Sequence, residues 1–491
     1  MTAMSKSLAG ASFDQKVDWD NIHWPDVYDQ VRRMQMRIAK AIREKRYGKA
    51  KALQRLLACS FYAKLLAVKR VTENKGSKTA GVDGVIWRTP KQKINAVSTL
   101  KRKGYQTLPL RRIYIPKRNG EKRPLSIPTI KCRAMQALHL LGLEPIAETL
   151  ADKNSYGFRP KRSTADAIGM CFTVLCRRVS PQWILEGDIK SCFDKIDHDW
   201  LLANIPLDKV ILKKWLKAGY LEGEELHPTS EGTPQGGIIS PCILTMTLKG
   251  LEDVVTKAVK RSDKVRIVTY ADDFIVTGAS KEVLEHKVRP TIETFLVERG
   301  LTLSREKTKV THIDEGFDFL GFNVRKYNGR LFIKPSRRRE KDFVANIRNI
   351  IKTNQTVKTI DLIRFLNPRI RGWVNYYRHV VAKRTFHRVD HCIFESLWMW
   401  AKRRHPGKGL RWVKKKYFGT LLNDNWTFYA KYTDAAGEPA CLFIFQAIRV
   451  PIKRHIKVIA DANPYDPNYR DYFFQRESLK RITGPARTLV L

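Results

Sequence analysis

The sequence of 491 residues is long enough for several domains and is strongly basic: 92 Lys and Arg oppose 48 Asp and Glu, for a formal net charge of +44. Such a charge implies a polyanionic partner, although a membrane surface would also attract it. No run of about eighteen apolar residues is present, so we expect no membrane-spanning helix. Asp14, Asp18 and Asp20 precede any apolar stretch, which argues against a targeting peptide, and we expect a cytoplasmic, nucleoid-associated protein of bacterial type.

The eight cysteines are scattered, and none forms a C-x-x-C pair. Zinc ribbons and zinc-dependent HNH nucleases hold their metal through such pairs. We therefore expect no zinc, and we expect most of these cysteines to be reduced, buried thiols.

Residues 24–72 carry apolar side chains at helical spacing, which predicts helices. Between Val31 and Thr72, thirteen residues are Lys or Arg, and Glu44 is the only acidic one. Solvated helix faces usually mix both signs, so we prefer a surface for a nucleic-acid backbone over a plain solvated face.

A basic hairpin is predicted next. Residues 111–117 and 122–128 read as strands, and Asn119-Gly120 between them is a strong turn signal. Its basic side chains could hold phosphates: Lys117, Arg118, Lys122 and Arg123. The preceding glycine-rich loop, residues 75–84, lacks the G-K-[ST] ending of a P-loop, so we predict no mononucleotide cradle there.

Carboxylates follow two apolar strands. Residues 183–188 predict a strand that ends in Asp188, and residues 267–276 predict a hairpin with Asp272 and Asp273 at its turn. A helix cap is the plain alternative for Asp188, and a simple turn is the alternative for the pair. Adjacent carboxylates repel each other, and a hard cation such as Mg²⁺ would relieve that repulsion.

The segment up to residue 324 contains further predicted elements: helices over residues 129–152 and 281–299, a glycine-rich turn at 232–241 that opens a helix, and an aromatic strand pair at 317–324. Small residues in the turn would let another backbone or a base pair approach closely.

The composition changes beyond Lys334. A charge run at 337–341 marks a boundary, and helical spacing resumes through residues 362–377. Residues 402–416 hold eight basic side chains, no acid and Trp412, a mixture that suits nucleic acid. Residues 426–458 alternate more like strands, and the tail is loop-like.

A polymerase palm would bring three aspartates together, and Asp188, Asp272 and Asp273 fit that arrangement. In such a site two divalent ions, about 3.5–4 Å apart, bind the attacking and leaving oxygens of an in-line displacement at phosphorus. One ion would activate a primer 3′-hydroxyl, and the other would stabilise the leaving pyrophosphate. Carboxylates favour Mg²⁺, with Mn²⁺ as a substitute, whereas imidazole or thiolate would favour softer metals.

The order of the motifs resembles that of reverse transcriptases of the group II intron maturase family, from about residue 75 to about residue 475. The matching segments are Ser155–Thr164, Asp188 with Phe193, Pro234-Gln235-Gly236, Tyr270–Asp273 and Leu366–Arg378. The resemblance implies an α+β right-hand polymerase with fingers, an antiparallel palm sheet and an α-helical thumb. The implied domains are a basic helical segment (1–74), fingers and palm (75–335), a thumb or maturase domain (336–425) and a nucleic-acid-binding region (426–491).

The same resemblance implies residue roles. Asp188 and Asp272 would ligate both metals, with Asp273 assisting and the Ile189 carbonyl as a candidate further ligand. The implied nucleotide contacts are Phe193 as the gate against a ribose 2′-hydroxyl, Gln235 at the incoming nucleotide, Lys117 and Arg123 at its triphosphate, and Lys307 as proton donor to pyrophosphate. The implied primer grip is Phe319, Leu320 and Gly321, and the segment 75–108 would form a lid over the template. Nucleic-acid contacts are expected at Arg159, Arg371, Arg378, Arg403, Arg404, Lys414, Lys415 and Lys416.

The expected function is RNA-directed DNA synthesis from dNTPs on an RNA template with a DNA primer or target, combined with binding of group II intron RNA that assists splicing and retrohoming. Many bacterial relatives end in a zinc-stabilised HNH nuclease. Here residues 461–476 resemble the segment that leads into this nuclease, and the nuclease itself has no match, so we expect no DNA endonuclease. One alternative is a free-standing host reverse transcriptase in phage defence or DNA repair. Another is a non-catalytic RNA-binding splicing cofactor, against which the intact carboxylates argue.

Overall fold

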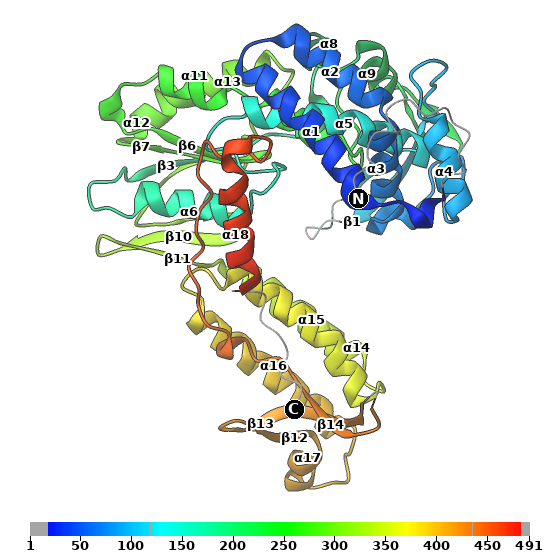
Figure 1. The fold of residues 1–491 in the computed structure, drawn as a ribbon. Helices are drawn as coiled ribbons and strands as arrows, with labels where there is room; N and C mark the ends of the chain where they lie inside the picture. The colour runs from blue at the N-terminus through cyan, green and yellow to red at the C-terminus, as the bar shows by residue number, and fades with distance from the viewer. Residues whose placement is uncertain (1–17, 117–119, 121, 435, 483–491) are drawn as a thin grey trace.

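The computed structural model describes residues 18–116, 120, 122–434 and 436–482 of the chain. Its fold is α+β, as predicted. Figure 1 shows a broad body of helices and sheets, from which a group of long helices extends downward to a small sheet.

The N-terminal helices pack around one central helix. The helix α5 (Ile130–Leu150) is buried along most of its length, because apolar residues cover nearly its whole circumference. The predicted helices over 24–72 are present and pack against it. The elements of this layer are η1 (Trp19–Asn21), α1 (Trp24–Arg43), α2 (Tyr47–Cys59), α3 (Phe61–Thr72), η2 (Lys75–Lys78) and α4 (Pro90–Thr99).

The predicted basic hairpin lies in a four-stranded sheet of order β2-β1-β4-β5. Its strands are β1 (Leu110–Pro116), β2 (Lys122–Ile127), β4 (Tyr220–Glu222) and β5 (Glu225–His227). The strands β1 and β2 pair antiparallel, which confirms the hairpin. Lys117 lies outside the described residues.

The second four-stranded sheet has the order β6-β7-β3-β8 and carries the acidic residues. Its strands are β3 (Trp183–Asp188), β6 (Arg266–Tyr270), β7 (Asp273–Gly278) and β8 (Lys309–His312). The strand β3 pairs antiparallel with β7 on one side and with β8 on the other, and each of its residues is buried or half-buried. Figure 1 shows helices on both faces of this sheet. The helices around this sheet and beside the neighbouring loops are α6 (Thr164–Leu175), α7 (Cys192–Lys195), α8 (His198–Asn204), α9 (Lys209–Leu216), α10 (Ser240–Thr247), α11 (Leu251–Lys257), η3 (Arg261–Asp263), α12 (Lys281–Val283), the π-helical turn η4 (Leu284–Val288) and α13 (Arg289–Val297).

The predicted aromatic strand pair is the start of a three-stranded meander, β9 (Phe317–Phe319), β10 (Phe322–Tyr327) and β11 (Arg330–Pro335). Long helices and a terminal sheet follow it. These elements are α14 (Arg337–Thr353), α15 (Thr359–Tyr377), α16 (Lys383–Arg403), α17 (Leu410–Tyr417), β12 (Phe418–Leu421), β13 (Asp424–Thr433) and β14 (Pro439–Phe443). The strand-like pattern predicted for 426–458 is therefore correct only as far as residue 443.

Residues 450–482, here called the C-terminal strap, return from the terminal sheet to the body and end in α18 (Arg470–Ile482), which contacts α6 (Figure 1). Two short turns lie at its start and within it, η5 (Ala447–Arg449) and η6 (Pro467–Tyr469). Asp166, fully buried in α6, accepts hydrogen bonds from the Val458 amide at 2.7 Å and from Arg476 at 2.7 Å, and it contacts His455 Nε2 at 2.8 Å. The strap is thus joined to the body by buried, charge-assisted hydrogen bonds.

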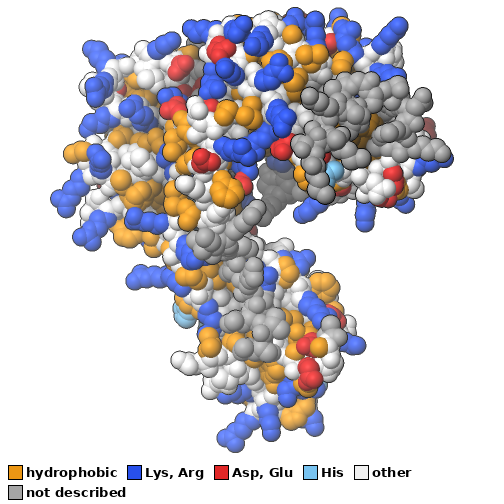
Figure 2. All heavy atoms as spheres, in the orientation of Figure 1, with side chains coloured by type: hydrophobic (Ala, Val, Ile, Leu, Met, Phe, Trp, Pro, Cys, Tyr) orange, Lys and Arg blue, Asp and Glu red, His pale blue; other side chains and the backbone are white. Residues whose placement is uncertain are grey.

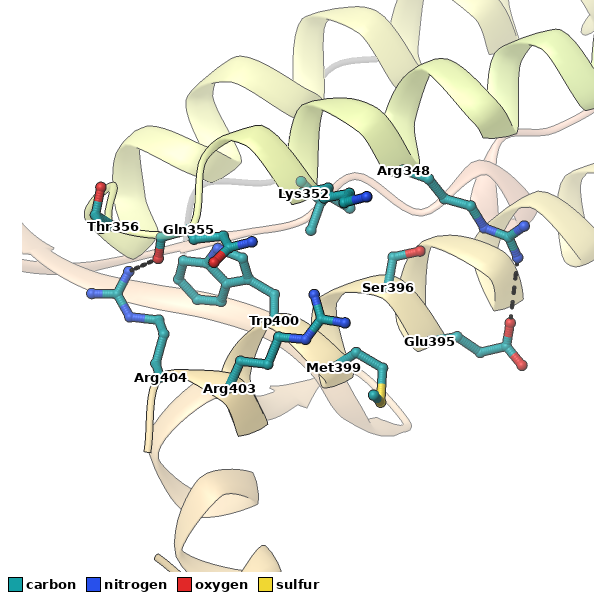
Figure 3. A pocket seen from close by; sticks show the side chains of 11 residues that line it. Arg348, Lys352, Gln355, Thr356, Glu395, Ser396, Met399, Trp400, Arg403 and Arg404 are labelled. Carbon is teal, nitrogen blue, oxygen red and sulfur yellow. Dashed lines mark hydrogen bonds and ion pairs between the residues drawn. The ribbon is translucent and has the colours of Figure 1, made fainter. Parts of the chain in front are cut away.

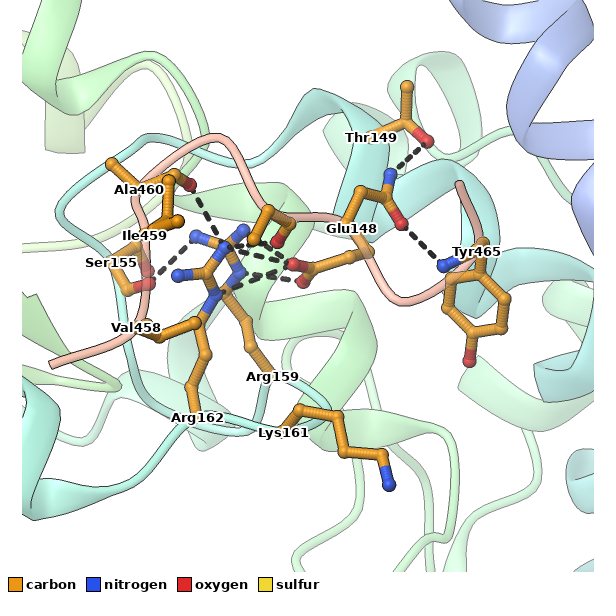
Figure 4. A network of polar contacts seen from close by, with 12 residues as sticks. Glu148, Thr149, Ser155, Arg159, Lys161, Arg162, Val458, Ile459, Ala460 and Tyr465 are labelled. Atoms are coloured by element: carbon orange, nitrogen blue, oxygen red, sulfur yellow. Dashed lines mark hydrogen bonds and ion pairs between the residues drawn. The ribbon is translucent and has the colours of Figure 1, made fainter. Parts of the chain in front are cut away.

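A second buried network holds the middle of the strap (Figure 4). Glu148 of α5 accepts hydrogen bonds from Arg159 Nε at 2.7 Å and from Arg162 at 3.1 Å. The same Arg162 nitrogen donates to the carbonyl oxygens of Ala460 at 3.1 Å and Ala462 at 3.2 Å. Both arginine side chains and the carboxylate are almost entirely shielded from solvent. One buried carboxylate therefore orients two guanidinium groups, and one of these binds the strap.

The expectation that Arg159 contacts nucleic acid is corrected by this network. Arg159 makes two hydrogen bonds to Glu148 and donates also to the carbonyl oxygens of Asp152 and Ser155. Four of its interactions are thus internal and its side chain is buried, so Arg159 stabilises the fold instead of binding a phosphate.

We predict that Glu148→Gln destabilises the protein strongly, by about 3–5 kcal/mol, because it leaves two buried guanidinium groups without a counter-charge. The urea midpoint should fall accordingly. The matched change Glu285→Gln removes an exposed carboxylate that lies 3.7 Å from Lys281, and it should alter stability by less than about 0.5 kcal/mol. Equal midpoints for the two variants would contradict the importance of the buried network.

Candidate active site

The turn between β6 and β7 has an unusual backbone conformation that its surroundings stabilise. Ala271 has a φ of +58°, a region that L-residues rarely adopt. The segment before α6 runs along the edge of β6, where the Tyr156 amide donates to the Thr269 carbonyl at 3.0 Å. A Cβ atom on Gly157 would lie 2.2 Å from the Ala271 nitrogen. Only glycine therefore lets this segment support the turn.

Strand register brings the three candidate aspartates together. Asp188, the last residue of β3, pairs with Asp273, the first residue of β7, and the Ile189 amide donates to the Asp272 carbonyl at 3.3 Å. Gly187 makes this pairing possible, because a Cβ atom there would lie 2.2 Å from the Phe274 ring. The three aspartates therefore lie together at one end of this sheet.

The carboxylates raise one another's proton affinity. Burial raises the pKa of Asp272, and the Asp188 carboxylate raises it further. Removal from solvent, followed by repulsion from Asp272 and Asp188, raises the pKa of Asp273 to about 7. Because the Asp273 side chain is exposed to solvent, repulsion from its neighbours outweighs burial in raising this pKa.

One ammonium group already contacts this cluster. Lys307 Nζ donates to Asp188 Oδ2 at 2.7 Å, and this hydrogen bond raises the pKa of Lys307. The loop that carries Lys307 is fixed against β3, since the Ser304 amide donates to the Asp188 carbonyl at 2.8 Å. Lys307 therefore lies directly beside the aspartates.

Asp188 and Asp272 line a cleft of about 1310 Å³. It brings together seven predicted site residues: Arg123, Asp188, Ile189, Phe193, Gln235, Asp272 and Lys307. The Phe193 ring meets the ring of Phe158 edge-on, with centroids 6.1 Å apart. Residues far apart in sequence thus line one cavity large enough for a nucleotide and a primer end.

Sequence reasoning assigned no role to Asp194. Gln235 Nε2 donates to Asp194 Oδ2 at 2.8 Å, so this carboxylate fixes the orientation of the amide. The Thr233 amide donates to the Phe193 carbonyl at 2.6 Å and ties the two loops together. The only feature of the sequence that could have indicated this role is the position of an acidic residue directly after Phe193.

The donor set suits a hard divalent cation. The described residues contain no group of three or more His, Cys, Asp or Glu side chains arranged as a metal site by themselves. Mg²⁺ commonly takes only one or two carboxylates and fills its octahedron with water and substrate phosphates. The solvent-accessible aspartates suit this kind of Mg²⁺ binding, because a bound cation relieves the repulsion that raises the pKa values of Asp272 and Asp273.

The predicted primer-grip turn lies between β9 and β10 and is fixed by α15. Leu320 has a φ of +52° and Gly321 a φ of +83°. The Tyr376 hydroxyl donates to the Leu320 carbonyl at 2.8 Å, and the Tyr377 hydroxyl donates to the Gly321 carbonyl at 3.2 Å. The turn therefore has a defined shape set by two tyrosines, while Phe319 is buried beside it.

The basic residues expected to bind nucleic acid lie mostly in the lower part of the molecule. Figure 2 shows Lys and Arg side chains across the visible face and at the lower end, where α17 lies. Arg403, Lys415 and Lys416 are exposed, whereas Arg371, Arg378, Arg404 and Lys414 are half-buried. Lys414 lies 4.2 Å from the centre of the Trp426 ring, and Lys416 lies 4.7 Å from that of Trp412.

Comparison with known proteins gives three family matches. Residues 115–324 match the reverse transcriptase (RNA-dependent DNA polymerase) family, residues 19–100 its N-terminal domain, and residues 340–418 the group II intron maturase-specific domain.

Two curated relatives are similar over most of their length. Protein YkfC of Escherichia coli is 35% identical over 343 residues, which cover 60% of this chain and 87% of that protein. The group II intron-encoded protein LtrA of Lactococcus lactis is 28% identical over 410 residues, covering 64% and 68%. A telomerase structure from Candida albicans aligns with a TM-score of 0.36 and 12% identity over 63% and 64% of the chains, a likeness too distant to carry an argument.

The fold and the matches define a reverse transcriptase with an RNA-dependent DNA polymerase domain and a maturase domain. The chain belongs to the group II intron reverse transcriptase/maturase family. This family implies nucleic-acid substrates and a divalent metal. In the part of the chain that the structure describes, no helix is both long and apolar enough to cross a membrane.

We predict that Gly157→Ala lowers the rate of DNA synthesis by about a hundredfold, because the added methyl group would displace the Ala271 turn and the aspartates beside it. Primer extension under single-turnover conditions measures the effect. Gly48→Ala, where nothing lies within 4 Å of the added methyl group, serves as control and should extend at the wild-type rate. A Gly157→Ala protein with wild-type extension would show that the turn tolerates the displacement.

A second prediction concerns pH and metal. The pKa of Asp273, about 7, lies above its unfolded value of about 3.9, so this group makes folding less favourable as the pH rises from about 4 to about 7. In EDTA, Asp273→Asn should therefore raise the melting temperature at pH 8 more than at pH 4.5. Adding Mg²⁺ at pH 8 should raise the melting temperature of the wild type more than that of the variant. Parallel melting curves across this pH range would contradict the account of carboxylate repulsion.

Proposed function

We propose that this protein synthesises DNA on an RNA template with two Mg²⁺ ions held at Asp188, Asp272 and Asp273, and that it binds group II intron RNA to assist splicing and retrohoming. The observation that carries the catalytic part is the convergence of these aspartates at one end of a sheet, beside a cleft of about 1310 Å³.

In this proposal, Asp188 and Asp272 ligate both ions, while Asp273 assists and the Ile189 carbonyl is a further candidate ligand. When bound, the ions would lower the pKa of the primer 3′-hydroxyl and neutralise charge on the leaving pyrophosphate. Mn²⁺ would substitute because it accepts the same oxygen ligands.

The side chains around the aspartates would position the nucleotide. Arg123 binds its triphosphate, and the Phe193 ring closes off the space that a ribose 2′-hydroxyl would need. Gln235, oriented by Asp194, contacts the nucleotide. Lys307 keeps its proton because of its contact with Asp188, and it gives that proton to the leaving pyrophosphate.

The maturase part rests on a different region. The match at residues 340–418 and the basic side chains of α16 and α17 support binding of structured RNA there. Contacts between Lys or Arg and phosphate release counterions, which makes such binding strongly dependent on salt. A self-splicing intron around the reading frame would distinguish this function from that of a host reverse transcriptase in defence or repair.

We predict that Asp272→Asn lowers primer extension by about a thousandfold or more, since it removes a ligand from both ions in a site that works by charge stabilisation. The variant should still bind group II intron RNA with wild-type affinity, because that task needs surface charge and not metal. Extension and filter binding on the same preparation measure the two activities. Asp199→Asn, an exposed aspartate away from the cleft, is the matched control.

Ordinary extension by a folded Asp272→Asn protein would refute the metal assignment. Loss of RNA binding in proportion to extension would refute the division between a catalytic cleft and RNA-binding helices.

A further inference from the structure

A groove lies between α14 and α16, far along the chain from the polymerase cleft. A cavity of about 810 Å³ is lined by both helices and the turn after α14. A second cavity, of about 590 Å³, shares Arg348 and Lys352 with it and extends along the same pair of helices. Together they form one groove, here called the α14–α16 groove, whose wider end is shown in Figure 3.

The groove is cationic, and its carboxylates are already paired. Glu340 binds Arg388 through two hydrogen bonds of 2.8 Å. Glu395 lies 3.8 Å from Arg348 and 3.3 Å from His391. The acidic groups thus leave little negative charge to offset the remaining basic side chains.

Three basic side chains of the groove have no internal partner. Within the described residues, Lys341, Lys352 and Arg403 make no hydrogen bond or ion pair, although each lines one of the cavities. Figure 3 shows Lys352 and Arg403 extending toward the groove from the two facing helices. Because Lys352 and Arg403 come from opposite walls of the groove, they could bind one phosphate group between them.

The floor of the groove differs chemically from its walls. Trp400 and Ile351 are 3% exposed, and the Trp400 indole nitrogen donates to the Asn354 carbonyl at 2.8 Å, which fixes the ring. Met399 beside them is 46% exposed and offers a polarisable thioether. Among the described residues, the Gln355 side-chain amide makes no hydrogen bond, so it can donate to and accept from a ligand.

We propose that the α14–α16 groove binds a single unpaired nucleotide of a structured RNA. The phosphate lies between Lys352 and Arg403, the base contacts the apolar floor and Met399, and Gln355 reads the edge of the base. Unpaired bases that leave a helix are the parts of RNA that proteins recognise by stacking and edge contacts. A cavity of about 810 Å³ is of the size that small-molecule sites have. This inference rests on the proposed maturase function and names one RNA element that it would recognise.

The test compares two RNA hairpins that differ only in one bulged uridine. Wild-type protein should bind the bulged hairpin about tenfold more tightly than the fully paired one, the effect expected of one hydrogen bond to the base edge and one contact with Met399. The variant Lys352→Ala with Gln355→Ala should reduce this preference to below about twofold. Lys431→Ala, an exposed lysine on β13, removes the same charge outside the groove and should keep the full preference. An abasic site in the bulge keeps the phosphate but loses the base, so it should bind more weakly than the bulged uridine and more tightly than the paired hairpin.

A second measurement does not depend on any variant. A 4-thiouridine at the bulge should form its photo-crosslink within the peptide that contains Met399 and Trp400. A crosslink elsewhere, or equal binding of both hairpins by the wild type, would overturn the inference while leaving salt-dependent RNA binding, and with it the proposed function, intact. Absence of all RNA binding would instead overturn the proposed function. Binding of poly-glutamate in the groove without any preference for the bulge would assign it to an acidic protein and also overturn the inference.

Discussion

Repulsion among the carboxylates of Asp188, Asp272 and Asp273 is the constraint on which the catalytic part of the molecule depends. Backbone pairing between β3 and β7 holds these groups together at a cost in electrostatic free energy, which appears as the raised pKa values of Asp272 and Asp273. The surrounding structure must therefore resist the separation that the charges favour. Antiparallel neighbours on both sides of β3, and the close approach of Gly157 to the turn, supply that resistance.

The local elements of this site could be predicted because they depend on nearby residues. Strand β3 is an apolar run that ends in Asp188, β6 and β7 are β-branched runs on either side of the Asp272-Asp273 turn, and the aromatic alternation at 317–324 forms β9 and β10. Resemblance to a known family added the residue roles, and the cleft contains most of the residues that are expected to bind metal or nucleotide. Their roles themselves remain proposals.

The contacts that could not be predicted from the sequence join residues that lie far apart in the chain. Asp166 meets Arg476, and Arg162 meets Ala460, across about three hundred residues, and no local pattern marks such pairs. Arg159 looked like a phosphate contact because arginine favours phosphate, yet its neighbour in space is the buried Glu148. The strap lacks strands between residues 450 and 466 because its backbone amides bond to side chains and single carbonyl groups instead of a neighbouring strand.

The most direct test of the central claim is a crystal structure with a primer, an RNA template, an unreactive dNTP analogue and Mn²⁺, measured at the manganese absorption edge. The account predicts two anomalous peaks about 3.5–4 Å apart, both within ligand distance of Asp188 and Asp272. Peaks elsewhere in the cleft, or an ordered primer and nucleotide without any metal at these aspartates, would contradict it.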